Sequence, residues 1–417
     1  MLKRIRTLIQ ITVLLTVIAL LASPAVGKDD NKGFIYGRVV TESGSEYTGF
    51  LRWGNQEACW DDLFHSGKDE FPFLEYLDDD TLDDLKKSRR KQYSFFKKFK
   101  VTVDDDGFVS RMFIARFGDI GKIEPRGDGE AVLMMKNGTK YPVEGAADDV
   151  SSKIHVNDAS LGKIDLHWDK IELIEFKPVP KNADPGVWRL YGRVETEEGP
   201  FEGHIQWDKQ ECISIDKLDG DNEDGDISIE MGRIQSIERK SRRASTVVLK
   251  DGRELVLEGS NDVNHENRGI MVADARYGRV TIGWSAFEKV TFIEGKGSGP
   301  GYNDFPARGP LQGTVMTTDG ETFTGRLVID LDESEGWEIL NGDVGDIGFD
   351  VPFYLIASLE PQGHDECLVV LKSGESIVLE DGQDVSDDNA GVLVIKSNKN
   401  AMYIEWDEVK KITFDHK

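Results

Sequence analysis

The stretch STVVLKDGRELVLEGSNDVNHENRGIMVADARYGRVTIGWSAFEKVTFIE, residues 245–294, carries the pattern that decides the fold. Short runs of apolar, β-forming residues, 247–249 and 255–257, stand on the two sides of Asp251-Gly252. Asp-Gly between two β-rich runs predicts a hairpin, because both central residues of such a turn tolerate positive φ angles. A second hairpin is predicted around Tyr277-Gly278, and the tail from Trp284 to Phe292 predicts a short turn and a last strand. The stretch is therefore predicted to hold five short strands.

The landmarks of this stretch recur along the chain. A Trp stands eight residues before a Phe in the pairs Trp168–Phe176, Trp284–Phe292 and Trp406–Phe414. A preceding unit with a similar outline opens at Tyr36, Tyr191 and Gln312. Self-similarity of this kind is typical of stacked or tandem units. The chain is therefore predicted to contain three long repeats, each made of two halves.

Each half is predicted to place five short strands in about fifty residues, which suits a small closed barrel. The outline resembles the Sm-like and SH3-like small β-barrels. The match lies in Val-x-Leu-x-Asp-Gly-x-x-Leu at 247–255, followed by a late strand, a single turn and a last strand at 280–292. It is a resemblance of strand pattern and covers most of residues 34–417. The predicted fold class is all-β: three tandem repeats, each a pair of small five-stranded barrel-like modules. A closed ring of six blades is the competing arrangement.

Residues 1–27 have the composition of a secretory signal peptide. Lys3, Arg4 and Arg6 precede an apolar run at 8–22, and small residues follow it. The alternative is an uncleaved membrane anchor, but the apolar run is shorter than the ~20 residues that span a bilayer. We therefore expect an exported chain, periplasmic, in the cell envelope or extracellular, with no stable membrane span after signal cleavage.

Three repeats are predicted after the signal peptide. They cover residues 28–178, 189–294 and 310–417. The first carries a partly helical insertion at 66–110, because its leucines have helical spacing and its acidic residues precede its basic ones. The basic and aromatic end of the insertion is of a kind that binds nucleic acid or anionic polymers, but the aspartates before it are predicted to neutralise it. The glycine-rich linker at 295–309 is predicted to be flexible.

The chain is strongly acidic, with a formal net charge of −26. This charge argues against nucleic acid and anionic membrane surfaces as partners, and favours divalent cations or basic partners. The alternative is simply an acidic, soluble surface. The three cysteines, Cys59, Cys212 and Cys367, cannot form a complete disulfide framework and are predicted to be buried thiols. We expect Cys59 and Cys212 to be well separated if each repeat folds by itself.

One acidic run has the composition of a metal-binding loop. Its candidate metal ligands are Asp219, Asp221, Glu223 and Asp226. Hard cations take oxygen ligands, and the run resembles the Asp-x-Asp-x-Asp-Gly calcium loop. It departs from that loop because Gly225 falls one place late and Glu223 replaces the usual Asp or Asn. The alternative is a polar hairpin made of good turn residues. Calcium is the candidate cofactor, although no cofactor is expected to be required.

Other polar and aromatic residues recur at fixed positions of the repeats. One series is Asp149, Asp262 and Asp384; another, to which no role is assigned, is Glu57, Glu211 and Glu333; the tryptophans are Trp53, Trp168, Trp207, Trp284 and Trp406. The aspartates line equivalent binding sites or, as we favour, act as caps that make local hydrogen bonds. The tryptophans are sugar-stacking platforms or, as we favour, core plugs at the ends of amphipathic strands.

No catalytic constellation is evident. The seven histidines are scattered, and neither a Gly-x-Ser-x-Gly elbow nor a phosphate-binding Gly-x-x-x-x-Gly-Lys is present. We therefore expect a non-catalytic exported binding or scaffold protein whose partner is a protein or an extended polymer. The alternatives are an extracellular hydrolase or lyase that acts on a polymer, and a calcium-stabilised adhesion-like module.

Overall fold

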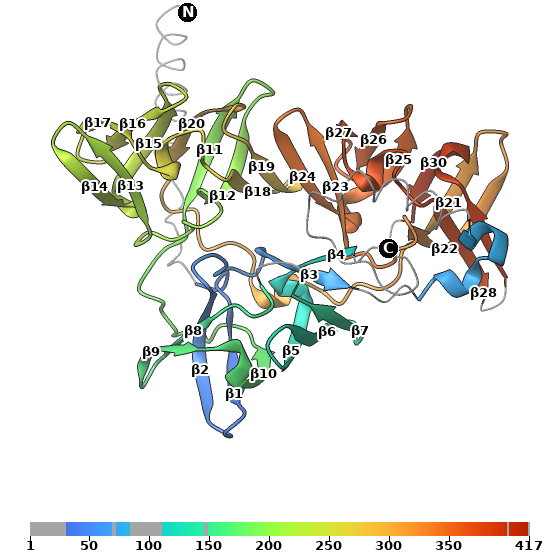
Figure 1. Cartoon of the computed structure of the whole chain (residues 1–417), viewed down its shortest axis with the longest axis horizontal. Coiled ribbons are helices and arrows are strands. Elements are labelled where there is room, and N and C mark those ends of the chain that lie inside the picture. Colours follow the sequence, from blue (N-terminus) through green and yellow to red (C-terminus); the bar gives the residue numbers. More distant parts are fainter. Residues whose placement is uncertain (1–30, 69–71, 84–110, 146–148, 398–399, 416–417) are drawn as a thin grey trace, which may run out of the picture.

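The computed structural model describes residues 31–68, 72–83, 111–145, 149–397 and 400–415. The predicted signal peptide and the basic, aromatic end of the insertion lie outside these residues. The described chain is almost wholly β, as predicted, and its strands form antiparallel sheets (Figure 1). None of its helices is both long and apolar enough to cross a membrane.

The described strands fall into three sets of ten. The first repeat contains β1 (Tyr36–Thr41), β2 (Glu46–Trp53), β3 (Leu63–Lys68), β4 (Arg111–Arg116), β5 (Ile120–Arg126), β6 (Glu130–Met135), β7 (Lys140–Glu144), β8 (Ile154–Asp158), β9 (Gly162–Leu166) and β10 (Ile171–Phe176). The second contains β11 (Tyr191–Thr196), β12 (Phe201–Gln206), β13 (Lys217–Asn222), β14 (Gly225–Glu230), β15 (Ile234–Arg239), β16 (Ala244–Leu249), β17 (Glu254–Glu258), β18 (Ile270–Asp274), β19 (Gly278–Ile282) and β20 (Phe287–Phe292). The third contains β21 (Gln312–Thr317), β22 (Thr322–Ile329), β23 (Ile339–Val344), β24 (Ile347–Pro352), β25 (Ile356–Pro361), β26 (Glu366–Leu371), β27 (Ser376–Glu380), β28 (Val392–Ser397), β29 (Asn400–Ile404) and β30 (Val409–Phe414).

Short 3₁₀ helices occupy several connections. They are η1 (Leu74–Tyr76), η2 (Phe117–Asp119), η3 (Trp168–Lys170), η4 (Met231–Arg233), η5 (Asn261–Val263), η6 (Tyr302–Asp304), η7 (Phe353–Leu355), η8 (Gln383–Val385) and η9 (Trp406–Glu408). The predicted tight turn after Trp168 and Trp406 is one of these helices in the first and third repeats, and the last strand of the repeat follows it.

The same strand order recurs in all three repeats. In the second repeat it is β19-β18-β12-β11-β20-β15-β16-β17-β13-β14. The first and third repeats pair their corresponding strands in the same way. The two halves of a repeat exchange strands: β11 and β12 lie with β18, β19 and β20, whereas β13, β14 and β15 lie with β16 and β17. A half is therefore not folded by itself, and the expected closed barrels stay a prediction.

The second and third repeats form one continuous sheet. Edge strand β19 pairs with edge strand β24, with Val280 opposite Phe349 and Ile282 opposite Ile347. All four side chains are buried, and the apolar cores of the two repeats merge. The first repeat has a separate core, to which Phe305 and Trp337 contribute from outside it.

Buried and partly buried ion pairs attach the first repeat to the other two. A carboxylate at an equivalent position of each repeat accepts two backbone N–H groups of its own loop; these residues are Asp62, Asp216 and Glu338. Each also meets a cation from another repeat. The pairs are Asp62–Arg279 at 3.1 Å, Asp216–Arg52 at 2.7 Å and Glu338–Lys68 at 3.7 Å. Because a buried charge needs a partner, these pairs set how the repeats sit against one another.

The linker at 295–309 is packed against the first repeat, contrary to its predicted flexibility. Ser298 is buried and its Oγ accepts a hydrogen bond from the Gly33 backbone N at 2.9 Å. The Tyr302 ring lies 4.6 Å from that of Trp60, and Phe305 is buried. These side chains hold the linker against the first repeat, whereas its glycine content alone had predicted a flexible segment.

All three cysteines are buried free thiols, as predicted. Cys59 and Cys212 are nevertheless not separated, because both belong to one small apolar cluster with Phe34, Ala58 and Ile213 between the first two repeats. The prediction that Cys59 and Cys212 are well separated is wrong, because the first and second repeats pack against each other at this cluster.

The insertion of the first repeat reaches the third. Its described part contains η1 and a helical turn at 79–83, in agreement with partly helical character. Phe73, Leu74 and Leu77 pack against a cluster that includes Leu393 of β28. Residues 84–110 of the insertion lie outside the described residues.

Candidate functional site

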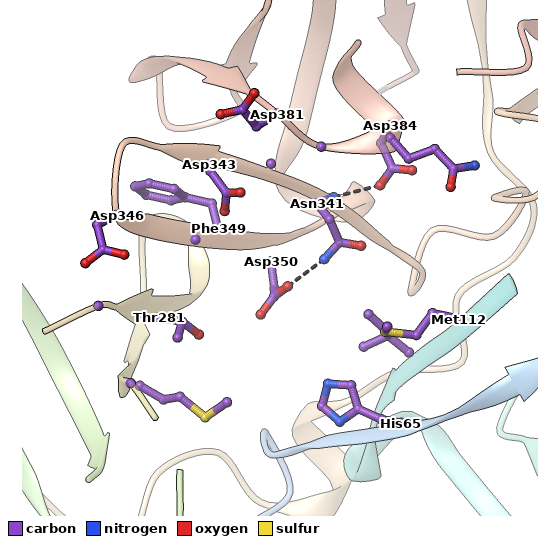
Figure 2. A pocket seen from close by; sticks show the side chains of 18 of the residues that line it. His65, Met112, Thr281, Asn341, Asp343, Asp346, Phe349, Asp350, Asp381 and Asp384 are labelled. Atoms are coloured by element: carbon purple, nitrogen blue, oxygen red, sulfur yellow. Dashed lines mark hydrogen bonds between the residues drawn. The ribbon is translucent and has the colours of Figure 1, made fainter. Parts of the chain in front are cut away.

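A central acidic cleft opens where the three repeats meet. It has a volume of about 940 Å³. The first repeat contributes His65 and Met112, and the second contributes Thr281 (Figure 2). Lys209 and Arg268 of the second repeat also line the cleft. The acidic residues of its wall all come from the third repeat: Asp330, Asp332, Glu333, Asp343, Asp346, Asp350, Asp381, Asp384 and Asp388. The cleft therefore exists only because the repeats are assembled.

The β23–β24 hairpin presents much of this acidic wall. Asp343 lies near its turn, and Asp350 lies opposite Asn341, whose side-chain amide donates to the Asp350 carboxylate. Asp346, in the turn, accepts a hydrogen bond from the Ser285 backbone N at 3.1 Å. Asp381 projects from the loop after β27 (Figure 2). Strand alternation thus brings several carboxylates to one side of the cleft.

Four of these carboxylates lack a compensating cation. In the described part of the chain, none of Asp343, Asp346, Asp350 and Asp381 lies within 4.0 Å of a Lys, Arg or His nitrogen in an ion pair. Burial, together with the neighbouring Asp381 and Asp350 charges, raises the pKa of Asp343. Burial also raises the pKa of Asp350. The cleft therefore carries negative charge that its own side chains do not neutralise.

The opposite rim offers little positive charge. The Arg268 guanidinium is committed to Asp208, with an Nη2–Oδ2 distance of 2.6 Å. The ring Nδ1 of His65 lies 3.5 Å from Asp149 Oδ2. Met112 is 63% exposed and adds apolar surface. A ligand entering from this side meets aspartates on one wall, and Lys209, the paired Arg268 and apolar surface on the other.

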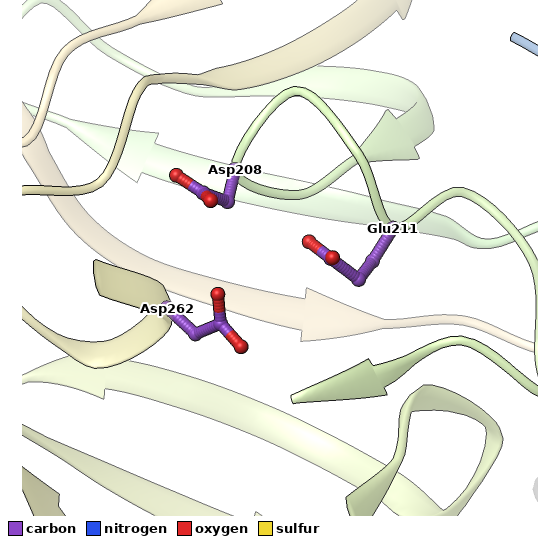
Figure 3. Close-up of side chains that lie close together, drawn as sticks. All are labelled: Asp208, Glu211 and Asp262. Carbon is purple, nitrogen blue, oxygen red and sulfur yellow. The ribbon is translucent and has the colours of Figure 1, made fainter. Parts of the chain in front are cut away.

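Two groups of three carboxylates form at equivalent places. The second-repeat trio is Asp208, Glu211 and Asp262, and the third-repeat trio is Asp330, Glu333 and Asp384. In each trio, one oxygen from every residue lies within 4.8 Å of the others. Figure 3 shows the three side chains of the second-repeat trio lying close together. The third-repeat trio lines the cleft, whereas the second-repeat trio does not.

Local structure brings each trio together. The first two members lie in the tight turn after β12 or β22, and the third lies in η5 or η8. Because β12 pairs with β18, which follows η5, the turn and the 3₁₀ helix become neighbours. Asp208 and Asp330 have left-handed φ angles of 50° and 52°. Such angles are unusual for residues other than Gly, Asn or Asp.

Each aspartate of the trios accepts a hydrogen bond, whereas each glutamate has one buried oxygen without a donor among the described residues. Asp262 Oδ2 accepts from the Asp219 backbone N at 2.7 Å, and Asp384 Oδ2 accepts from the Asn341 backbone N at 2.7 Å. By contrast, Oε2 of Glu211 and Oε2 of Glu333 are buried and accept no hydrogen bond from the described residues.

Burial and crowding shift the acidity of the trios. Burial, with the neighbouring Asp262 and Asp208 charges, raises the pKa of Glu211 to about 8. Burial raises the pKa of Asp262 to about 6. Burial and the Asp332 charge raise the pKa of Glu333 as well. The glutamate of each trio therefore binds its proton more tightly than an ordinary carboxylate does.

The first repeat keeps only part of this arrangement. Glu57 and Asp149 occupy the equivalent positions, and Gly54 stands where the other repeats have Asp208 and Asp330. Burial and the Asp149 charge raise the pKa of Glu57. The first repeat is thus a natural comparison with two carboxylates in place of three.

The residues predicted as metal ligands lie elsewhere. Asp219 and Asp221 are on β13, Asp226 is on β14 and Glu223 is in the turn between them, and all four are exposed. None belongs to a group of three close carboxylates in the described residues. The run therefore takes the hairpin form that was the alternative, and calcium at this place stays a prediction.

The recurring residues fall into clear roles. Asp149, Asp262 and Asp384 accept backbone hydrogen bonds, but from strands distant in sequence and not locally as expected. The glutamates to which no role was assigned lie beside them. All five tryptophans are buried, which confirms that they are core plugs. The recurring aspartates and the recurring glutamates were both visible in the sequence and hinted at the trios. The strand pairing that brings the two series together was not.

Comparisons with known proteins give no family. No protein-family model matches the chain, and no curated protein is significantly similar to it. A solved chain described as a streptogramin B lyase structure aligns with 72% of this chain and 94% of its own length, at 10% identity and a TM-score of 0.11. Neither fold nor function is inferred from a likeness of that size.

Proposed function

We propose that this is a non-catalytic, exported binding protein whose central acidic cleft takes a basic segment of a partner polypeptide. The observation that carries the proposal is the set of four aspartates, Asp343, Asp346, Asp350 and Asp381, that face a cleft of about 940 Å³ and form no ion pair with any cation of the described residues. Export is supported by the composition of residues 1–27.

The chemistry of the walls favours Arg or Lys side chains as the ligand groups. Paired carboxylates suit the planar guanidinium of Arg, which donates two parallel hydrogen bonds to one carboxylate. The apolar stems of these side chains suit the exposed Met112 on the opposite wall. The net charge of −26 also attracts a basic partner over a distance and accelerates its encounter.

The test is the affinity for a fluorescent arginine-rich peptide, followed by anisotropy beside a neutral peptide of the same length. Asp343→Asn with Asp381→Asn should weaken binding of the basic peptide about tenfold, or ~1.4 kcal/mol. Binding should also weaken with added salt, because the charges are partly exposed.

The matched control removes two acidic charges from the equivalent hairpin of the second repeat, as Glu223→Gln with Asp226→Asn. It should leave the affinity nearly unchanged, because both side chains are exposed on the β13–β14 hairpin, whose residues do not line the cleft. Equal weakening by both double variants would mean that the peptide senses only total charge, and the proposal would fail.

A further inference from the structure

We infer that the second-repeat trio and the third-repeat trio are each a binding site for a divalent cation, with calcium as the expected ion. The third-repeat trio lines the cleft of the proposed function, whereas the second-repeat trio lies outside it, so the second site can be tested independently of that function. It also places the cation away from the acidic hairpin at 219–226.

The geometry of the trios is suited to an oxygen-liganded ion. Three carboxylates offer oxygens within 4.8 Å of one another, a spacing that one cation of the usual calcium–oxygen distance of about 2.4 Å can bridge. Oxygen is the only donor type in both trios, so a hard cation is favoured over zinc or copper, which prefer nitrogen or sulfur. Calcium accepts irregular geometry and 6–8 ligands, so water and a second carboxylate oxygen can complete its shell.

A second observation points to a missing ligand. Oε2 of Glu211 and Oε2 of Glu333 are buried without a hydrogen-bond partner in the described residues. A buried carboxylate oxygen is normally satisfied by a donor or a cation, because desolvation without compensation is costly. Both oxygens belong to the trios, and neighbouring Asp208 and Asp330 are almost fully buried at 0% and 1% exposure.

The arrangement occurs twice with the same spacing. Each member of the third-repeat trio follows its counterpart by 122 residues, since 330 − 208, 333 − 211 and 384 − 262 all equal 122. The unpartnered oxygen is on the same residue type in both places. Recurrence at the same position of both repeats is what a ligand site built into the repeated unit requires.

The neighbouring side chains hold the trios ready for an ion. Arg268 and Asn261 donate to Asp208, and Gln383 donates to Asp330 at 2.6 Å. These donors fix the orientation of the first carboxylate, as hydrogen-bond partners behind metal ligands commonly do. Arg268 neutralises only one of three carboxylates, so a dication is still favoured by charge.

The experiment is calorimetric titration of calcium into the purified, chelator-treated chain, with magnesium in a parallel titration. We expect two calcium sites per chain and a rise in melting temperature with calcium. Glu211→Gln and Glu333→Gln should each remove one site, and the double variant should remove both along with the calcium-dependent shift.

The first repeat supplies the control. Glu57→Gln changes the equivalent residue where Gly54 leaves only two carboxylates, and it should leave two sites. The Gln variants are close in shape to Glu and relieve charge crowding, so a folded protein is expected; its melting temperature without calcium verifies this. The inference is overturned if ~1 mM calcium, the weak end of the range for protein sites, does not bind. It is also overturned if Glu211→Gln with Glu333→Gln leaves the stoichiometry unchanged, or if Asp221→Asn with Asp226→Asn abolishes binding.

Discussion

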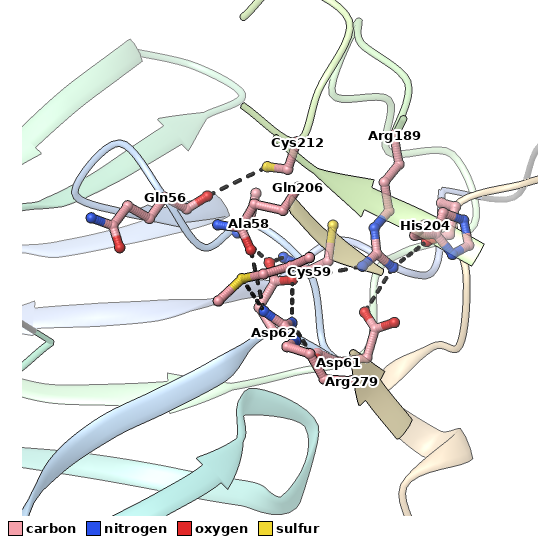
Figure 4. A network of polar contacts seen from close by, with 12 residues as sticks. Gln56, Ala58, Cys59, Asp61, Asp62, Arg189, His204, Gln206, Cys212 and Arg279 are labelled. Carbon is pink, nitrogen blue, oxygen red and sulfur yellow. Dashed lines mark hydrogen bonds and ion pairs between the residues drawn. The ribbon is translucent and has the colours of Figure 1, made fainter. Parts of the chain in front are cut away.

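His204 lies beside a buried charge network between the first and second repeats. In Figure 4, Arg189 reaches Asp61, with an Nη1–Oδ1 distance of 2.7 Å, and Arg279 reaches Asp62. The His204 ring lies beside this network, with Nε2 at 3.2 Å from the Gly297 carbonyl oxygen. Burial and the Arg189 charge lower its pKa to about 4. The folded protein therefore holds this histidine neutral under conditions in which an unfolded chain protonates it.

The pH dependence follows from that difference. The ordinary pKa is 6.5, so the unfolded chain binds more protons between pH 6.5 and 4, and stability falls as the pH is lowered through this window. The loss should approach about 3 kcal/mol near pH 4, at 1.36 kcal/mol per pKa unit. Urea unfolding at several pH values should show that His204→Gln loses less stability than the natural chain. The exposed His167, changed to Gln, should leave the slope unaltered.

Strand β19 shows how a small element decides the arrangement of two repeats. Gly278 opens the strand with a φ angle of +92°, and a Cβ there would lie 2.5 Å from Pro352 Cδ and 2.7 Å from the Asp350 carbonyl oxygen. The equivalent residue of the first repeat, Gly162, has a φ angle of +77° and an open surrounding. The third repeat has Asn400 at this place. Strand β24 can therefore approach this closely only because residue 278 is a glycine. Of the three repeats, the second alone has both the glycine and the neighbouring strand at this place.

Comparing Gly278→Ala with Gly162→Ala distinguishes the cost of disturbing the β19–β24 pairing from the cost of placing alanine at a positive φ angle. Both variants should lose roughly 1–2 kcal/mol of unfolding free energy, because alanine is unfavourable in the left-handed region. Gly278→Ala should cost about 1–3 kcal/mol more, because its methyl group collides with the partner strand. Chemical unfolding of the two variants gives this difference directly. Equal destabilisation would show that the β19–β24 pairing tolerates a side chain at position 278.

At the level of elements, the sequence predicts where strands lie but not which strands pair with each other. The turn at Asp251-Gly252 lies between β16 and β17 as predicted, because turn chemistry is local. The exchange of strands between halves was not predicted, because alternation marks a strand without naming its neighbour. The same limit applies to the trios. Glu211 and Asp262 were noticed separately, and only the β12–β18 pairing places them together.

At the level of the whole molecule, the cleft depends on charges that meet across the repeats. Lys68 of β3 is buried, with its Nζ 2.5 Å from Asp332 Oδ1 and 3.7 Å from Glu338 Oε1. Both carboxylates are buried in the third repeat. No local pattern predicts such a contact, since its partners are more than 260 residues apart in sequence. The composition predicted an acidic molecule, but not that one lysine would join its first and third repeats.

Lys68→Met should therefore weaken the assembly as well as the fold. The change leaves Asp332 and Glu338 buried without their cation, and breaking a buried pair in this way costs about 3–5 kcal/mol. We expect a lower unfolding free energy and a larger radius of gyration in X-ray scattering as the first repeat separates. Lys122→Met is the control, because Lys122 is 40% exposed and its pair with Glu175 should contribute no more than ~1 kcal/mol. Adding Asp332→Asn and Glu338→Gln to Lys68→Met should recover part of the loss, since the stranded charges are removed. If Lys68→Met costs no more than Lys122→Met and leaves the radius unchanged, this ion pair does not hold the first repeat in place.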